Sequence, residues 1–116
     1  MLSVESIYYY PDVSAAFAEA HRVLRPGAKA FILTNYYKEN THSHNWAKYI
    51  DIPVQLLGAA DYLELLSRAG FRAVTHRRIV DSNPLPEDWK PTNWFRTREE
   101  QAKFQAEGAL LLIAER

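Results

Sequence analysis

The stretch from Tyr10 to Tyr36, YPDVSAAFAEAHRVLRPGAKAFILTNY, decides the fold class of this chain. It opens on Pro-Asp, and the carboxylate of Asp12 can accept a hydrogen bond from the first turn of a following helix. Pro26 and Gly27 end that helix, because proline cannot continue it and glycine tolerates the reversal. The apolar run 28–34 then predicts a buried strand. The apolar stripe of the helix recurs at three- and four-residue spacing: Val13, Ala16, Phe17, Ala20, Val23 and Leu24.

The flanking sequence predicts further elements of both kinds. A charged, alternating segment that contains Arg77 and Arg78 is typical of an edge strand defended by charge. A run that is apolar on both faces, such as ALLLIA, is typical of a central strand. Between the elements lie two long loops, 37–58 and 81–96, the first with a short helix near Trp46. The expected elements are a strand end at 2–8, a helix at 58–69, an edge strand at 71–80, a polar helix at 97–106 and a central strand at 109–114.

The order of these elements predicts an α/β fold. A strand, a helix and a second strand joined by short connections form a right-handed parallel crossover unit. The chain has 116 residues, which is enough for one small domain and too few for two. We therefore expect a single domain over residues 1–116.

Composition excludes several classes of function. Lys and Arg together number 14, as do Asp and Glu, so no basic surface for nucleic acid or an anionic membrane is expected. No apolar run approaches the roughly 20 residues of a membrane span, and the first residues do not resemble a targeting peptide. The absence of cysteine is consistent with a cytoplasmic protein and leaves no thiolate metal ligands.

The ordered motifs ESIYYYPD, RVLRPGA and SRAGF, with the strands and loops between them, carry a resemblance to a known family. The chain resembles the C-terminal half of a class I S-adenosylmethionine-dependent methyltransferase, from its fourth strand onward. The resemblance implies a partial, mixed, Rossmann-like sheet. In that sheet the last strand, 108–115, is antiparallel between 28–36 and the outer strand 71–80.

One part of the family pattern is missing from these residues. The family binds its cofactor through a glycine-rich turn and an acidic residue that precede the fourth strand, and none of the four glycines here forms a Gly-x-Gly turn. The resemblance implies that Ser3, Val4 and Glu5 follow the fourth strand and contribute one wall of an S-adenosylmethionine site. We expect the isolated chain to bind this cofactor poorly and to be inactive, and we identify no catalytic residue.

The resemblance also implies where a small-molecule substrate would bind. Tyr9 corresponds to a position that faces the substrate in relatives, and Tyr36, His44 and Trp46 belong to the loop after the next strand. Ligands of open α/β sheets lie beyond the carboxyl ends of parallel strands, where that loop begins. Two imidazoles, those of His42 and His44, could share a metal ion, but no third ligand occurs at useful spacing. No metal site is therefore predicted.

A second hypothesis is that the chain is a non-catalytic binding or assembly module. Without three preceding strands, the edge of the fourth strand and one sheet face are left uncovered, and such an edge can pair with another chain. We therefore expect a homo-oligomer that forms through this edge. A separate chain that supplies the glycine-loop half stays a third possibility.

Overall fold

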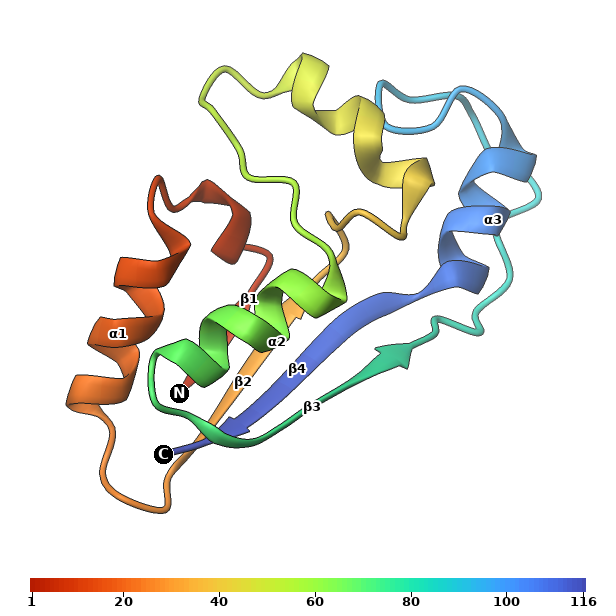
Figure 1. Cartoon of the computed structure of the whole chain (residues 1–116). Helices are drawn as coiled ribbons and strands as arrows, with labels where there is room; N and C mark the ends of the chain where they lie inside the picture. The colour runs from red at the N-terminus through yellow and green to blue at the C-terminus, as the bar shows by residue number, and fades with distance from the viewer.

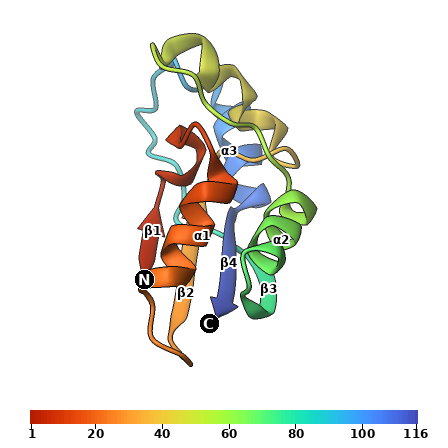
Figure 2. The same cartoon turned by 60° about the vertical axis from the view of Figure 1, so that its left-hand side comes forward.

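The computed structural model describes all residues 1–116 and shows a four-stranded mixed sheet (Figure 1). Two α-helices lie side by side on one face of the sheet, and a third lies beyond one end of the strands (Figures 1 and 2). The elements in chain order are β1 (Leu2–Val4), the 3-10 turn η1 (Ile7–Tyr9), α1 (Val13–Val23), β2 (Lys29–Thr34), the 3-10 segment η2 (Thr41–Tyr49), α2 (Ala59–Arg68), β3 (Arg72–Ile79), α3 (Arg98–Glu107) and β4 (Ala109–Glu115).

The strand order is β1-β2-β4-β3, which confirms the predicted arrangement. β1 and β2 are parallel, with Ser3 opposite Ile32. β4 is antiparallel to both of its neighbours, β2 and β3, with Leu112 opposite Ile32 on one side and His76 on the other. The carboxyl ends of β1, β2 and β3 therefore lie at the same end of the sheet as the start of β4.

Helix α1 begins and ends where its sequence predicts. Asp12 accepts a hydrogen bond from the Ala15 amide at 3.0 Å and so caps the first turn. The buried residues of α1 lie on its predicted stripe, whereas Val23 at its end is 60% exposed. Gly27 follows with φ of 84°, a left-handed conformation that glycine adopts without a steric penalty.

The core lies between the sheet and the two helices. Ile32 of β2 and Leu112 of β4 are fully buried there, together with Phe17 of α1 and with Tyr62 and Leu66 of α2. The prediction of a buried strand at 28–34 holds for one of its two faces and is wrong for the other. We call that face the open sheet face; its apolar members are Leu2, Val4, Phe31, Leu33, Leu111 and Ile113, of which Leu2 is 73%, Val4 51% and Phe31 37% exposed.

A second group of elements lies beyond the carboxyl ends of β1, β2 and β3 (Figure 1). It comprises η2, the irregular segment 80–97 and helix α3, which is capped by Thr97 through a 3.1 Å bond from the Glu100 amide. Aromatic side chains join these segments. The Trp46 ring of η2 lies 5.7 Å from Trp94 and 5.3 Å from Phe104 of α3, measured between ring centroids.

Two local expectations differ from the structure. The helix expected near Trp46 is a longer 3-10 segment, Thr41–Tyr49. His21, whose place on the polar face of α1 predicts a solvated side chain, packs edge-on against Phe71 at 5.2 Å and lies over Gly70. It does so because the turn after α2 approaches the end of α1.

None of the helices has the length and apolar composition that a membrane span requires.

Candidate functional site

Glu5 is the first residue after β1, at the carboxyl end of the strand. Its backbone has φ of 53°, an uncommon conformation for a residue with a side chain, and its amide donates to the Leu33 carbonyl at 2.9 Å. Its carboxylate accepts bonds from the Asn35 amide and side chain at 2.7 and 2.9 Å, and from the Tyr8 hydroxyl at 3.2 Å. Burial raises the pKa of Glu5, an effect larger than the lowering by these hydrogen bonds.

A cavity of about 390 Å³ opens beside this network, and we call it the aromatic cavity. It lies where η1, the end of β2, η2, the segment 94–95 and α3 meet. Its wall contains six aromatic rings and one amide, with no charged side chain: Tyr8, Tyr9, Asn35, Trp46, Ile50, Trp94, Phe95 and Phe104. Such a largely apolar wall with a few polar groups is typical of small-molecule sites.

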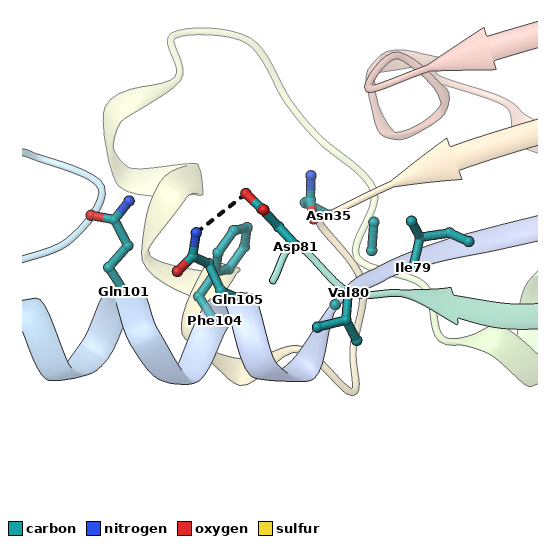
Figure 3. A pocket seen from close by; sticks show the side chains of 9 residues that line it. Asn35, Ile79, Val80, Asp81, Gln101, Phe104 and Gln105 are labelled. Carbon is teal, nitrogen blue, oxygen red and sulfur yellow. Dashed lines mark hydrogen bonds between the residues drawn. The ribbon is translucent and has the colours of Figure 1, made fainter. Parts of the chain in front are cut away.

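A second cavity, of about 330 Å³, lies between β3, the start of β4 and α3, and we call it the polar cavity (Figure 3). Asn35 and Phe104 belong to the walls of both cavities. Across it, the Gln105 side chain donates to Asp81 at 3.3 Å, as the dashed line in Figure 3 marks. Both cavities therefore lie at the end of the sheet where ligands of open α/β folds bind.

The predicted substrate residues divide into two pairs. Tyr9 and Trp46 lie in the wall of the aromatic cavity. Tyr36 is buried and packs edge-on against Tyr8 at 5.3 Å, behind that wall. The His44 ring forms a 2.9 Å bond to the Lys38 carbonyl and does not line the cavity.

The predicted cofactor residues lie on both sides of the end of β1. Ser3 and Val4 belong to the strand itself, so the loop expected there begins only at Glu5. Ser3 and Val4 line a groove between β1 and α1, of about 380 Å³, in which Glu19 is the only charged residue. This groove has neither a carboxylate after a strand nor a glycine turn, so the residues present do not complete a site for S-adenosylmethionine.

Several residues of the aromatic cavity were not predicted. Asn35 directly follows a strand, and that position alone marks it as a candidate. Phe104 is an apolar residue in an otherwise polar helix, which is also a signal in the sequence. Trp94 and Phe95 offered no local pattern, because only the chain's path brings them to Trp46.

Comparisons with known proteins agree with this topology. No protein-family model matches the sequence. The chain superposes over 98% of its length, with a TM-score of 0.85 and 31% identity, on a chain from the complex between the Haloferax volcanii Trm112 methyltransferase activator and a protein described as a methyltransferase. Together with the antiparallel β4 between β2 and β3, this match decides the family.

The chain belongs to the class I S-adenosylmethionine-dependent methyltransferases. It is also 33% identical, over 78 residues, to the chloroplastic 2-methyl-6-phytyl-1,4-hydroquinone methyltransferase of Spinacia oleracea. That match covers 67% of this chain. A methyltransferase of Mesorhizobium loti shares the fold, with a TM-score of 0.68 and 15% identity over 99% of this chain.

The match covers only part of each relative. The chain spans 51% of the Haloferax chain and 22% of the Spinacia methyltransferase. The chain thus matches about half of one relative and less than a quarter of the other. That β1 stands in the place of the family's fourth strand stays a prediction.

Proposed function

We propose that residues 1–116 form a C-terminal half-domain that supplies the acceptor side of a small-molecule methyltransferase. The aromatic cavity carries this proposal, because it lies beyond the carboxyl ends of β1 and β2 and has the size and apolar wall of a ligand site. Methyl transfer chiefly requires an acceptor held in line with the methyl group in a dry pocket. S-adenosylmethionine would supply that methyl group at a site that needs residues beyond these 116.

The residues of this chain contribute one part of the reaction on this proposal. The end of β1 forms a wall beside the methyl donor, with Ser3, Val4 and Glu5 as its candidates. Tyr9 and Trp46 contact the acceptor, while Tyr36 and His44 support the loop from behind. Because the cofactor site is incomplete, the isolated chain is inactive.

A chimaera tests the proposal. Residues 1–116 would replace the matching half of the Haloferax protein, whose fold they share. We expect calorimetry to detect cofactor binding by the chimaera and no tight 1:1 binding by the isolated chain. We further expect transfer of labelled methyl groups to small-molecule acceptors by the chimaera only. A chimaera that binds the cofactor and methylates no small molecule would contradict the proposal, as would tight binding by the isolated chain.

A second candidate function is assembly through β1, and one observation favours it. The outer edge of β1 has no strand partner, and the adjoining open sheet face exposes Leu2, Val4 and Phe31. An unpaired edge next to exposed apolar side chains is a template for another strand. On this hypothesis the chain forms a homo-oligomer, and light scattering that finds a monomer at high micromolar concentration would contradict it.

A further inference from the structure

The aromatic cavity is walled by rings that already pack against one another. Trp46 meets Trp94 at an interplanar angle of 72° and Phe95 at 78°, both edge-to-face arrangements. Phe95 and Phe104 lie 4.9 Å apart at 54°. Because edge-to-face packing is a favourable geometry for aromatic pairs, a further planar ring can join such a cluster in the same way.

Asn35 supplies a hydrogen-bond acceptor to this cavity. Its side-chain NH₂ donates to Glu5 Oε1 at 2.9 Å, and its backbone N–H donates to the same oxygen at 2.7 Å. These two bonds fix which way the amide points, since a flipped amide would place an oxygen against the carboxylate. The amide oxygen, Oδ1, accepts no bond from the protein and is free to accept one from a ligand.

The charges around the cavity favour a neutral ligand. No cation lines the wall, so an anion would lose its water without compensation and would lie near Glu5. The Glu5 carboxylate is bonded to two residues of the wall, and its two oxygens already accept three hydrogen bonds from Asn35 and Tyr8. An ammonium group would therefore find no unused carboxylate oxygen in the wall itself.

The polar group of the Trp46 indole lies behind the same wall and is not presented to a ligand in the cavity. Its N–H is buried and has no hydrogen-bond acceptor in the protein. A hydroxyl group both donates and accepts, whereas an ammonium group only donates. A hydroxyl can therefore donate to Asn35 Oδ1 without bringing a charge into a wall that has no charged side chain.

We propose that the aromatic cavity binds the methyl acceptor as a planar, uncharged aromatic ring whose hydroxyl group donates a hydrogen bond to Asn35 Oδ1. The ligand's role as methyl acceptor rests on the proposed function, whereas the binding of such a ring in the cavity does not. Glu5 is a positioning residue here, since it acts on the ligand only through Asn35 and Tyr8.

Binding of 2-naphthol to the intact 116-residue chain tests the proposal without any cofactor. The three tryptophans give separate indole N–H signals in an NMR spectrum. We expect the signals of Trp46 and Trp94 to shift on titration, with a dissociation constant on the order of 0.1–1 mM. Trp89 is the internal control, because its indole N–H donates to Gln101 at 2.6 Å, outside the aromatic cavity.

Matched probes separate the features of the ligand. We expect 2-methoxynaphthalene, which has no hydroxyl donor, to bind about fivefold more weakly, the effect of one ordinary hydrogen bond. Decahydro-2-naphthol tests the planar ring, 2-naphthoate the negative charge and trimethylphenylammonium the positive charge, and each should bind more weakly than 2-naphthol. Equal or tighter binding of any of these four probes would overturn the corresponding part of the proposal.

Two variants place the ligand in the cavity. Asn35→Ala should weaken 2-naphthol about fivefold and leave 2-methoxynaphthalene unchanged, a difference that simple loss of structure would not produce. Trp94→Ala, at a position that is 41% exposed, should weaken both probes. Trp89→Phe is the matched control and should alter neither. Absence of 2-naphthol binding, or binding that Asn35→Ala leaves unchanged, would overturn the inference.

The outcome is separable from that of the proposed function. A chimaera that methylates only aliphatic or cationic acceptors, while 2-naphthol fails to bind, would refute the inference and leave the methyltransferase proposal intact. Binding of 2-naphthol at Trp46 and Trp94, together with a cofactor-loaded chimaera that transfers no methyl group, would support the binding inference and refute the methyltransferase proposal.

Discussion

Glu5 Oε1 accepts two hydrogen bonds from a single residue, Asn35: one from its backbone amide at 2.7 Å and one from its side chain at 2.9 Å. The two residues follow neighbouring parallel strands, β1 and β2, and are 30 positions apart in the sequence. Their contact joins the ends of these strands and sets the orientation of the one amide in the wall of the aromatic cavity. Glu5 also accepts a bond from the Tyr8 hydroxyl of the same wall, and burial raises the pKa of its carboxyl group.

Glu5→Gln should become more stable relative to the parent protein as the pH rises. Burial raises the pKa of Glu5, so the native state binds this proton more tightly than the unfolded state does. Stability therefore falls as the pH rises from the ordinary value of 4.5 to the raised native value. A glutamine keeps an acceptor oxygen for Asn35 and does not titrate. Urea unfolding across this pH interval should show a difference in the free energy of unfolding between variant and parent. That difference should grow with pH and then stay constant.

Glu87→Gln, at an exposed position, controls for the loss of one negative charge. A gap for Glu5→Gln that shrinks with rising pH would show that the hydrogen bonds outweigh burial.

Gly70→Ala should destabilise the protein more than Gly27→Ala. Both glycines have a left-handed φ, 104° and 84°, so each alanine costs about 1–2 kcal/mol for the backbone alone. At Gly70 the new methyl group would also lie 2.9 Å from the His21 ring, whereas at Gly27 nothing lies within 4 Å. Thermal unfolding should therefore give a lower midpoint for Gly70→Ala. The added variant His21→Ala should recover part of the difference; equal midpoints for the two alanine variants would contradict the His21 contact.

Tyr37→Phe should cost about 1–3 kcal/mol of unfolding free energy. The Tyr37 hydroxyl is buried and donates to the Gly108 carbonyl at 2.6 Å, and without it that acceptor loses its partner. The bond joins the loop after β2 to the start of β4. Tyr10→Phe, at a residue that is 48% exposed, is the matched control and should change little. Chemical denaturation measures the free energy of unfolding of both variants. An unchanged value for Tyr37→Phe would contradict the prediction and mean that water replaces the hydroxyl.

Leu2→Lys should lower the average molar mass of the protein if assembly uses β1. The side chain is 73% exposed, so a lysine there is compatible with the fold, while its charge opposes the approach of an apolar partner. Ile52→Lys is the matched control, because Ile52 is 54% exposed and lies in the segment between η2 and α2, away from β1. Light scattering should find smaller particles for Leu2→Lys alone. An equal effect of both lysines would show general charge repulsion and count against the β1 edge.

The sequence predicts the sheet well because its signals are local. The Asp12 cap, the Pro26 and Gly27 stop and the double-faced apolar run of β4 each specify an element without help from distant residues. The charged strand at 72–79 likewise lies at the edge, as predicted. Val23 belongs to the predicted apolar stripe of α1 but is exposed, because no other residue of this chain covers the end of the helix on that side.

The candidate site is harder to predict because its contacts are not local. Tyr9 and Trp46 were expected near a ligand, and both lie in the aromatic cavity. Trp94 and Phe104 complete it from a segment whose path depends on tertiary packing. His21 shows the same limit: its position on the helix predicts a solvated side chain, but the turn at Gly70, 49 positions on, covers part of it. Periodicity along one element does not report what another element brings to it.

β4 follows β1, β2 and β3 in the sequence yet lies between β2 and β3 in the sheet. During synthesis the ribosome therefore releases both neighbours before the strand that pairs with each of them. Until then β3 has no strand partner, and the edge of β2 that faces β4 is unpaired. The half-made sheet thus depends on late, long-range pairing, which slows folding and exposes apolar strands to other chains.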